Sequence, residues 1–201
     1  MFVTFEGADG AGKSSALASV AAELSAQGHP VFSTREPGAG EFGAEVRRLL
    51  LGATKPIPEA ELFLFLADRA QHIATIVRPA LARGEIVLCD RHADSTLVYQ
   101  AIARGLDEPF VRAANSFATG GLRPDLTLLF DVDIEEAQSR LKDRDRIDDE
   151  DRRFHDRVRE GFRRIAAEEP DRIRLLDSRQ PASVVANLAR EAILSRLMVK
   201  R

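Results

Sequence analysis

The segment Gly7–Ser14, which reads GADGAGKS, constrains this chain more than any other feature. It fits the phosphate-binding pattern of a glycine, any four residues, then Gly-Lys and Ser or Thr. The glycines allow a tight turn whose N–H groups point at phosphate oxygens, and the positive end of the following helix adds to the attraction. An apolar run typical of a strand precedes the segment and a helical run follows it. We therefore expect the chain to bind a nucleoside triphosphate.

The side chains of this loop predict how the triphosphate is held. Lys13 is placed to reach the β- and γ-phosphates, and the hydroxyl of Ser14 is placed to hold Mg²⁺. A glycine-rich turn that binds nothing is the alternative, but the flanking strand and helix disfavour it. The residues that we expect to contact the nucleotide are Gly7, Ala8, Asp9, Gly10, Ala11, Gly12, Lys13, Ser14 and Ser15.

Length and composition limit the remaining classes of protein. A chain of 201 residues predicts a single domain that spans residues 1–201. No apolar run reaches the length of a membrane span, and the N-terminus enters the first predicted strand directly, so we expect neither membrane contact nor a targeting segment. The lone Cys89 excludes an internal disulfide and suits the cytoplasm. A net charge of −3 gives no general reason to bind nucleic acid.

Apolar runs rich in strand-forming residues alternate with longer helical runs along the whole chain. This order predicts an α/β fold with a five-stranded parallel sheet flanked by helices. The predicted strands are Phe2–Glu6, Val31–Thr34, Ile86–Cys89, Leu126–Asp131 and Arg172–Leu176. The predicted helices lie near Lys13–Gln27, Phe42–Leu51, Glu59–Arg83, Asp94–Leu106, Glu108–Thr119, Ile134–Lys142, Asp149–Glu168 and Ala182–Met198.

The segment 144–153 reads RDRIDDEDRR and is the least apolar stretch of the chain. It has one aliphatic residue in ten, so we expect it to lie at the surface. Two interpretations remain open from the charge pattern alone. It is either a solvated helix start with ion pairs between successive turns, or a mobile lid that brings arginines onto a transferring phosphate.

Other motifs narrow the class of nucleotide-binding protein. The Asn-Lys-x-Asp motif that GTPases normally carry is absent. A motor protein would have a strand that ends in an acidic pair, whereas the strand before Asp90 is followed by one aspartate and then Arg91. Ligands bind at this end of the strands in parallel α/β sheets, so Asp90 is placed to hold the metal through water and Arg91 to neutralise phosphate. A surface ion pair is the alternative interpretation.

Seven sequence pieces that together span nearly the whole chain resemble those of thymidylate kinases and occur in the same order. They are Glu6–Ser14, Thr34–Gly38, Arg47–Leu51, Leu64–His72, Asp90–Gln100, Arg123–Thr127 and Phe154–Arg159. Each piece is weak alone, but their order makes the resemblance highly specific. It implies an α/β fold like that of P-loop nucleoside monophosphate kinases, with a lid at about residues 140–153. It also implies phosphoryl transfer from MgATP to dTMP, giving dTDP and ADP, in dTTP biosynthesis.

The resemblance further implies how thymine is recognised. Phe65 matches an aromatic ring that stacks on the base, although core packing is its alternative role. Arg69 lies four residues later, on the same helix face, and matches an arginine that donates to O4 of thymine. Thr96 matches a polar residue that reads the base edge. Tyr99 matches a ring that crowds the 2′ position of the sugar and so favours deoxyribose.

The resemblance implies a charged cluster around the acceptor phosphate. Asp9 matches a carboxylate that contacts the 3′-hydroxyl and the metal environment, and Arg35, Arg47 and Arg91 match the arginines around the phosphate. Three guanidiniums suit a dianionic monophosphate. Pro37 matches a turn proline, and the sequence leaves its cis or trans form open. The residues that we expect to bind dTMP are Asp9, Arg35, Pro37, Arg47, Phe65, Arg69, Arg91, Ser95, Thr96 and Tyr99.

Family members carry a catalytic arginine either in the phosphate loop, directly after the aspartate, or in the lid. Because Gly10 follows the aspartate here, the chain resembles the bacterial, lid-arginine type, and an arginine at position 10 is expected to replace the lid arginines in part. We expect Arg144 and Arg146 to act, since they lie where the chain is least able to pack, while Arg157 matches an arginine that faces the phosphates. The basic lid candidates are Arg140, Lys142, Arg144 and Arg146. The expected catalytic residues are Lys13, Asp9, Arg91, Arg144 and Arg146, with Ser14 and Asp90 as metal ligands.

Two other functions remain as alternatives. A deoxynucleoside kinase needs a base near the 5′-hydroxyl and has less use for three phosphate-binding arginines. A regulatory nucleotide-binding module needs no base pocket, and it would turn over dTMP slowly or not at all. The family resemblance implies a homodimer, with Glu59–Arg83 and Glu108–Thr119 as contact surfaces, and places the adenine of ATP against residues 177–181.

Overall fold

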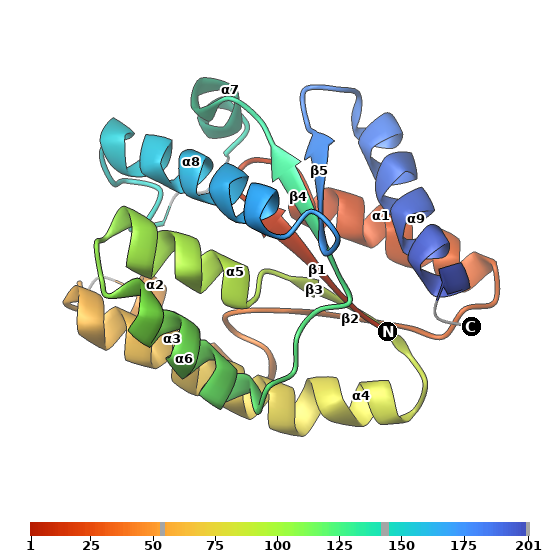
Figure 1. Ribbon diagram of the computed structural model, residues 1–201, viewed down its shortest axis with the longest axis horizontal. Coiled ribbons are helices and arrows are strands. Elements are labelled where there is room, and N and C mark those ends of the chain that lie inside the picture. The colour runs from red at the N-terminus through yellow and green to blue at the C-terminus, as the bar shows by residue number, and fades with distance from the viewer. Residues whose placement is uncertain (53–54, 142–144, 200–201) are drawn as a thin grey trace.

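The computed structural model describes residues 1–52, 55–141 and 145–199. Its centre is a five-stranded sheet in the order β2-β3-β1-β4-β5, with every neighbouring pair parallel (Figure 1). The predicted five-stranded parallel sheet is confirmed, and the predicted strand ends differ from the observed ones by at most one residue. The strands are β1 (Phe2–Gly7), β2 (Val31–Arg35), β3 (Ile86–Asp90), β4 (Leu126–Asp131) and β5 (Ile173–Asp177).

The central strands are buried because helices cover both of their faces, which explains why their sequences lack polar alternation. All six residues of β1 are buried. Val3 pairs with Leu88 on β3 and with Leu126 on β4, so three apolar runs lie side by side. Removing these side chains from water is the main driving force for forming the sheet.

The helices lie on the two faces of the sheet (Figure 1). On one face, α1 (Lys13–Ala26) and α9 (Ala182–Val199) pack against each other and against the strands. The other face carries α4, α5 and α8, and α2, α3 and α6 extend this layer outward. Among the described ranges, no helix combines the length and the apolar character needed to cross a bilayer. The other helices are α2 (Gly40–Leu51), α3 (Pro58–His72), α4 (Arg78–Ala82), α5 (Ala93–Thr96), α6 (Glu108–Thr119), α7 (Ile134–Ser139) and α8 (Arg152–Glu168).

Two predicted helices change pitch along their length. The predicted helix Glu59–Arg83 consists of α3, a π-helical stretch at Ile73–Val77, and α4. The predicted helix Asp94–Leu106 consists of α5 followed by a π-helical stretch at Leu97–Ala103. Hydrophobic periodicity does not separate an α-helix from a short π-helical insertion, because the insertion shifts the spacing by only one residue.

The start of α8 was predicted too early, at Asp149. The helix begins at Arg152, because Asp151 caps it: the carboxylate accepts a hydrogen bond from the backbone N–H of Phe154 at 2.7 Å. An aspartate at this position satisfies a backbone donor that the helix itself cannot pair.

The strand order determines where a ligand can bind. The chain leaves β1 for β2 and β3 on one side of it and then crosses to β4 on its other side. At the carboxyl ends of the strands, the loops that follow neighbouring strands therefore lead away in opposite directions. This leaves a crevice at that edge of the sheet. The phosphate loop follows β1 directly, so it lies at this crevice.

Candidate active site

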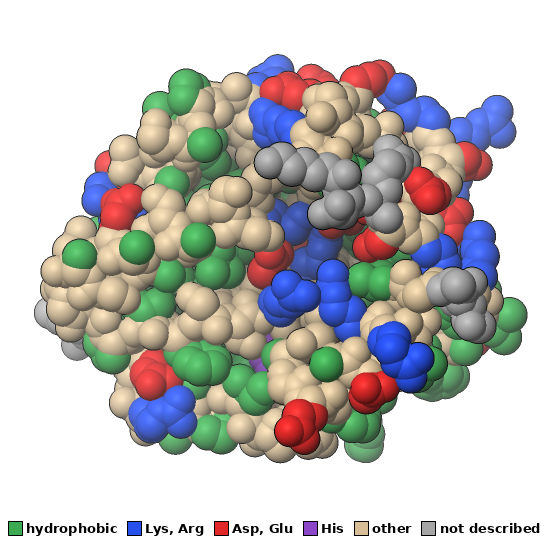
Figure 2. Space-filling view, turned by 180° about the vertical axis from the view of Figure 1, so that it is seen from behind, with side chains coloured by type: hydrophobic (Ala, Val, Ile, Leu, Met, Phe, Trp, Pro, Cys, Tyr) green, Lys and Arg blue, Asp and Glu red, His purple; other side chains and the backbone are tan. Residues whose placement is uncertain are grey.

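A cavity of about 840 Å³ lies at the carboxyl ends of the central strands. Its walls come from the phosphate loop, the ends of β2 and β3, helices α2, α3 and α5, the start of α9, and Arg140, Leu141, Asp145 and Ile147. Figure 2 shows basic side chains gathered in and around the hollow near the middle of one face of the molecule. The cavity thus combines a loop suited to phosphate with further positive charge.

The phosphate loop keeps its shape because only glycine fits at two of its turns. The φ angles of Gly7 and Gly10 are 138° and 78°, a region that residues with a Cβ rarely adopt. A Cβ at Gly7 would lie 2.4 Å from the carbonyl oxygen of Phe130, and one at Gly10 would lie 2.0 Å from that of Ala137. The loop therefore packs directly on the backbone of β4 and α7, and a larger residue at either glycine would displace it.

Lys13 opens α1 and extends its ammonium group over this loop. Its Nζ donates to the carbonyl oxygen of Ala8 at 2.7 Å and lies 4.0 Å from Oδ1 of Asp9. Burial and the nearby Arg91 charge lower the pKa of Lys13, against the opposing effect of the carboxylates around it. The side chain lines the cavity, where a phosphate oxygen would complete its contacts.

Asp9 joins the loop to the segment after β3. Arg91 NH2 donates to Oδ1 of Asp9 at 2.6 Å, and the Tyr99 hydroxyl donates to Oδ2 at 3.2 Å. Burial alone would raise the pKa of Asp9, but the charges of Arg91 and Lys13 and these hydrogen bonds hold it well below its ordinary value. Asp9 is therefore ionised at neutral pH, and it places Arg91 beside the loop.

Two oxygen donors meet where the loop faces β3. The hydroxyl of Ser14 donates to Oδ2 of Asp90 at 2.5 Å, and both residues line the cavity. Mg²⁺ prefers oxygen ligands, keeps several waters, and is commonly bound by one or two protein groups together with phosphates. Ser14 and Asp90 therefore fit a magnesium ion that accompanies a bound triphosphate.

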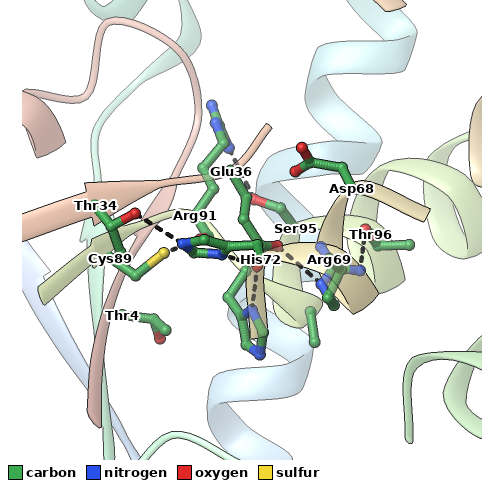
Figure 3. Close-up of polar contacts among 12 residues, drawn as sticks. Thr4, Thr34, Glu36, Asp68, Arg69, His72, Cys89, Arg91, Ser95 and Thr96 are labelled. Atoms are coloured by element: carbon green, nitrogen blue, oxygen red, sulfur yellow. Dashed lines mark hydrogen bonds and ion pairs between the residues drawn. The ribbon is translucent and has the colours of Figure 1, made fainter. Parts of the chain in front are cut away.

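A second group of possible metal ligands is buried behind the cavity. Ligand atoms of Glu36, His72 and Cys89 lie within 4.8 Å of one another. Both ring nitrogens of His72 are already in hydrogen bonds, one with Thr34 Oγ1 at 2.7 Å and the other with Glu36 Oε1 at 2.8 Å (Figure 3). This group therefore forms a hydrogen-bonded support for Glu36 rather than a shared set of open ligands.

Positive charge from β2 and α2 also reaches the cavity. Arg35 and Arg47 both line the cavity, and Arg47 NH1 donates to the carbonyl oxygen of Pro37 at 3.1 Å. Burial and the charge of Arg35 lower the pKa of Arg47. The peptide bond between Glu36 and Pro37 is cis. Two guanidiniums on one wall repel each other unless an anion lies between them, which suits a bound phosphate.

Arg69 on α3 is 1 % exposed yet reaches the cavity wall. Its Nε donates to Glu36 at 2.9 Å, and its NH1 donates to Thr96 Oγ1 at 3.0 Å and to Asn115 Oδ1 at 2.6 Å (Figure 3). Burial opposes the charge of Glu36, but Arg69 holds the pKa of that carboxyl well below its ordinary value. The network fixes one orientation of the guanidinium. The ring of Phe65 lines the same cavity.

The geometry therefore offers two anion-binding regions in one cavity. The phosphate loop forms the first, the arginines of β2 and α2 form the second, and Arg91 with Asp9 lies at the loop. An enzyme that moves a phosphoryl group needs both phosphates held in line and the developing charge neutralised. This arrangement meets both requirements.

Comparisons with known proteins agree with this geometry. The family model described as thymidylate kinase matches residues 5–189. The chain is 48 % identical to a thymidylate kinase from Desulfovibrio desulfuricans, over 96 % of this chain and 94 % of that protein. It is 44 % identical to a thymidylate kinase from Trichlorobacter lovleyi, over 99 % of each chain. The chain belongs to the thymidylate kinase family.

The thymidylate kinase fold is also seen in a solved structure. The crystal structure of thymidylate kinase from Ehrlichia chaffeensis superposes with a TM-score of 0.81 and 32 % identity, covering 96 % of this chain and 98 % of that one. The fold predicted from the resemblance, that of a P-loop nucleoside monophosphate kinase, is therefore confirmed.

Within this family member, most of the predicted site residues line one cavity. Every residue predicted to bind dTMP lines this cavity, and the two predicted metal ligands line it as well. Of the predicted nucleotide-binding residues, Gly7 and Ala8 form the loop without lining the cavity. The residues that do line it are Asp9, Gly10, Ala11, Gly12, Lys13, Ser14 and Ser15. The predicted adenine region also contributes, through Ser178 and Gln180.

The predicted lid arginines are placed differently. Arg144 lies outside the described residues. Arg146 is not part of the cavity lining: it donates to Glu61 Oε2 at 2.5 Å and to the carbonyl oxygen of Leu50 at 3.0 Å. Arg140 is the lid candidate that lines the cavity, and it donates to the carbonyl oxygen of Ser178 at 3.1 Å.

Two expectations about this part of the chain are wrong, the first of them only in part. The segment 144–153 was expected at the surface: Asp149 and residues 151–153 are exposed, but Ile147 and Asp148 are only 7 % and 4 % exposed. Ile147 packs in the apolar cluster that includes Leu62 and Phe154, so a single aliphatic residue anchors the segment. Arg157 was expected to face the phosphates, but its Nε donates to the carbonyl oxygen of Ala103 and it lines a separate cavity of about 230 Å³.

The sequence analysis assigned no role to three residues that hold the site together. Glu36 anchors Arg69, Asn115 on α6 accepts from the same guanidinium, and Glu61 binds Arg146. Glu36 lies inside a motif that resembles the family, which is a signal for its importance. Asn115 and Glu61 lie on helices whose pattern predicts only amphipathic packing, so nothing in the sequence marks them.

Proposed function

We propose that this family member transfers the γ-phosphoryl group of ATP to dTMP and releases ADP and dTDP. The observation that carries this proposal is the single cavity that both the phosphate loop and the arginines Arg35 and Arg47 line. A triphosphate held by the loop and a monophosphate held by these arginines would meet at Arg91.

ATP would lie along the phosphate loop, with Lys13 at its β- and γ-phosphates. Loop N–H groups and the amino end of α1 attract the phosphates. Mg²⁺, held by Ser14 and by Asp90 through water, would neutralise phosphate charge when bound. The adenine would lie toward residues 178–186, where the start of α9 contributes small and apolar side chains to the cavity.

The acceptor dTMP would lie across the cavity. Its phosphate would bind Arg35 and Arg47, its base would stack on Phe65, and Arg69 would donate to O4 of thymine. Tyr99 would close the space beside the sugar, because its hydroxyl is held at Asp9. Cytosine would present a donor to Arg69 and leave a buried group unpaired, which disfavours it.

Transfer itself would need no covalent intermediate on the protein. Lys13, Arg91 and the lid arginines would stabilise the charge on the transferring group, and closure of the lid would exclude water that otherwise hydrolyses ATP. The assignments of Arg144 and Arg146 to this role remain predictions, as does their dependence on both nucleotides being bound.

We also propose that the protein is a cytoplasmic homodimer. Phe63 on α3 and Phe110 and Phe117 on α6 are 57 %, 50 % and 89 % exposed, and α3 packs against α6. Exposed aromatic side chains on neighbouring helices favour a protein interface over water. Sedimentation of Phe117→Asp beside the unchanged protein tests this: a persistent dimer in the variant would exclude this surface.

The decisive experiment measures ADP formation with different acceptors. The proposal predicts rapid turnover with dTMP, slower turnover with dUMP, and little with UMP, CMP or thymidine. Preference for thymidine would indicate a deoxynucleoside kinase. Absence of turnover with every acceptor, in a protein that still binds ATP, would indicate a regulatory module.

A further inference from the structure

Glu6 is a buried carboxylate next to the active site that the mechanism above does not use. It is the last residue of β1 before Gly7, it is 0 % exposed, and it does not line the cavity. Its two oxygens accept three hydrogen bonds from the segment after β3. The backbone N–H groups of His92 and Ser95 donate to Oε1 at 2.7 and 3.3 Å, and the Ser95 hydroxyl donates to Oε2 at 2.5 Å.

These hydrogen bonds lie beside Arg91. Among the described residues other than glycine, Arg91 is the one with a positive φ angle. Arg91 has φ of 70°, a conformation that costs energy for a side chain of its size. Its own N–H donates to the carbonyl oxygen of Phe5 at 3.0 Å, and the next N–H, that of His92, donates to Glu6. Two consecutive residues of β1 therefore hold the backbone on both sides of the strained position.

The hydroxyl of Ser95 extends this control to the guanidinium. Ser95 Oγ donates its single hydrogen to Glu6, so its lone pairs are left to accept from Arg91 NH1 at 2.9 Å (Figure 3). The same NH1 donates to the carbonyl oxygen of Gly7 at 3.0 Å, while NH2 binds Asp9. Glu6 thus determines which way the serine hydroxyl points, and the hydroxyl helps to hold Arg91 at the phosphate loop.

We propose that Glu6 is a positioning residue for phosphoryl transfer, which acts by holding Arg91 at the phosphate loop. The proposal rests on the proposed function, in which Arg91 contacts the transferring group. Glu6 itself touches no substrate, since it lies behind the loop. Burial and the neighbouring Asp94 raise the pKa of Glu6 to about 7, against the lowering effect of Arg91 and the hydrogen bonds. Burial thus opposes the ionised form of Glu6, and the contacts with Ser95, the His92 N–H and the Arg91 charge favour it.

The hydrogen-bond pattern explains why an amide cannot replace this carboxylate. All three contacts need acceptors, and a carboxylate offers them on both oxygens. Glutamine offers one oxygen and one NH₂ group. If its oxygen meets the backbone N–H groups, its NH₂ meets Ser95, and the serine hydrogen then turns toward Arg91 and repels it. If its oxygen meets Ser95, its NH₂ faces two backbone donors.

The test compares Glu6→Gln, Arg91→Ala and the double variant in the full chain, with kcat and both KM values measured. We expect Glu6→Gln to lower kcat about 10- to 50-fold and to change the KM for ATP less than about twofold. In the Arg91→Ala background, Glu6→Gln should lower kcat by less than about twofold, because Glu6 acts through Arg91. Asp125→Asn is the matched control, since Asp125 accepts from the N–H of Phe2 at the other end of β1.

The outcomes separate this proposal from the proposed function. Full kcat in Glu6→Gln, or an equal loss in both backgrounds, would overturn the positioning role. Full kcat in Arg91→Ala would instead remove Arg91 from the reaction, whereas absence of dTMP turnover in the unchanged protein would contradict the proposed function. Thermal melting shows whether each variant folds. If Glu6→Gln does not fold, Ser95→Ala interrupts the same connection, and an equal loss in both Arg91 backgrounds would again overturn the proposal.

Discussion

The phosphate loop and the predicted lid, at about residues 140–153, both carry charge that our proposal brings to the transferring phosphoryl group, but the described residues of the two regions are held in different ways. In the loop, Gly7 and Gly10 have φ angles of 138° and 78°, which glycine adopts readily, so the turns follow from residue types a few positions apart. In the lid, Arg146 is held by Glu61, which lies 85 residues away in the sequence.

This difference shows why one region is easier to predict than the other. Backbone turns depend on residue types within a few positions, and glycine is required wherever a Cβ would clash. A charged side chain on a loop instead pairs with whatever the fold places beside it. Arg146 pairs with the carboxylate of Glu61, which is 1 % exposed. A buried carboxylate without a paired cation is strongly destabilising. The following experiments test how far the two regions differ.

The largest effect is expected in the phosphate loop. Lys13→Ala should lower kcat on the order of a thousandfold, because it removes the charge that follows the transferring group. The fold should persist, since within the described ranges the ammonium donates a single hydrogen bond, to the carbonyl oxygen of Ala8. Steady-state kinetics and circular dichroism check both statements, with the exposed Lys55→Ala as control. Turnover near that of the unchanged protein would exclude this loop from catalysis.

A smaller effect is expected in the lid. Replacing Arg144 and Arg146 together by Ala should lower kcat about a hundredfold while dTMP binding stays nearly constant, because the contact would form chiefly in the transition state. Single-turnover rates and equilibrium binding of dTMP measure this. A double variant with full kcat would mean that the segment is not a catalytic lid.

Glu61→Gln makes the comparison between loop and lid sharper. If Arg146 only secures the segment to α3, Glu61→Gln should lose at least as much activity as Arg146→Ala, because Glu61 also accepts from Arg104 Nε at 2.5 Å. In that case Arg144→Ala should carry the catalytic loss, which single-turnover rates measure. The sequence suggested that Gly10→Arg would restore part of the rate, but the structure overturns this expectation. A Cβ at position 10 would lie 2.0 Å from the carbonyl oxygen of Ala137, so the rescue should fail.

Base recognition is expected to depend on Arg69. Arg69→Ala should weaken kcat/KM for dTMP by about 2–4 kcal/mol in transition-state terms, since a buried acceptor on the base loses a charged donor. The KM for ATP should stay within about twofold. Thermal melting is the control, because the variant leaves Glu36 buried without its guanidinium partner. Equal losses for ATP and dTMP would show that Arg69 only supports the fold.

The smallest effect concerns Asp68, behind the turn at Gly38. Burial and the charge of Glu36 raise the pKa of Asp68 from 3.8 to about 6. The folded state therefore holds this proton more tightly than the unfolded chain, and stability due to Asp68 falls as pH rises from about 4 to 6. Asp68→Asn keeps an oxygen for the N–H of Gly38. Its gain in Tm by calorimetry should be larger at pH 8 than at pH 4.5, and equal gains would contradict this account.

The sequence by itself determined the features whose physics is local or repetitive. The spacing of Gly7, Gly12 and Lys13 specifies a phosphate loop, and alternating strand and helix patterns specify a parallel sheet. The strand ends were predicted within one residue, because apolar runs stop where burial stops. The residues that resemble thymidylate kinases located much of the cavity wall, including every residue predicted to bind dTMP, since the fold brings those motifs to the same edge of the sheet.

Only the tertiary structure decided which charged groups pair. Arg69 and Asn115 are 46 residues apart, and Arg91 and Ser95 lie next to Glu6 only because β1 and β3 are neighbours. The sequence also left open the cis form of the bond before Pro37 and the burial of Ile147. Pairing of buried charges depends on distances of a few ångströms between segments far apart in the chain, and periodicity or motif spacing carries no information about those distances.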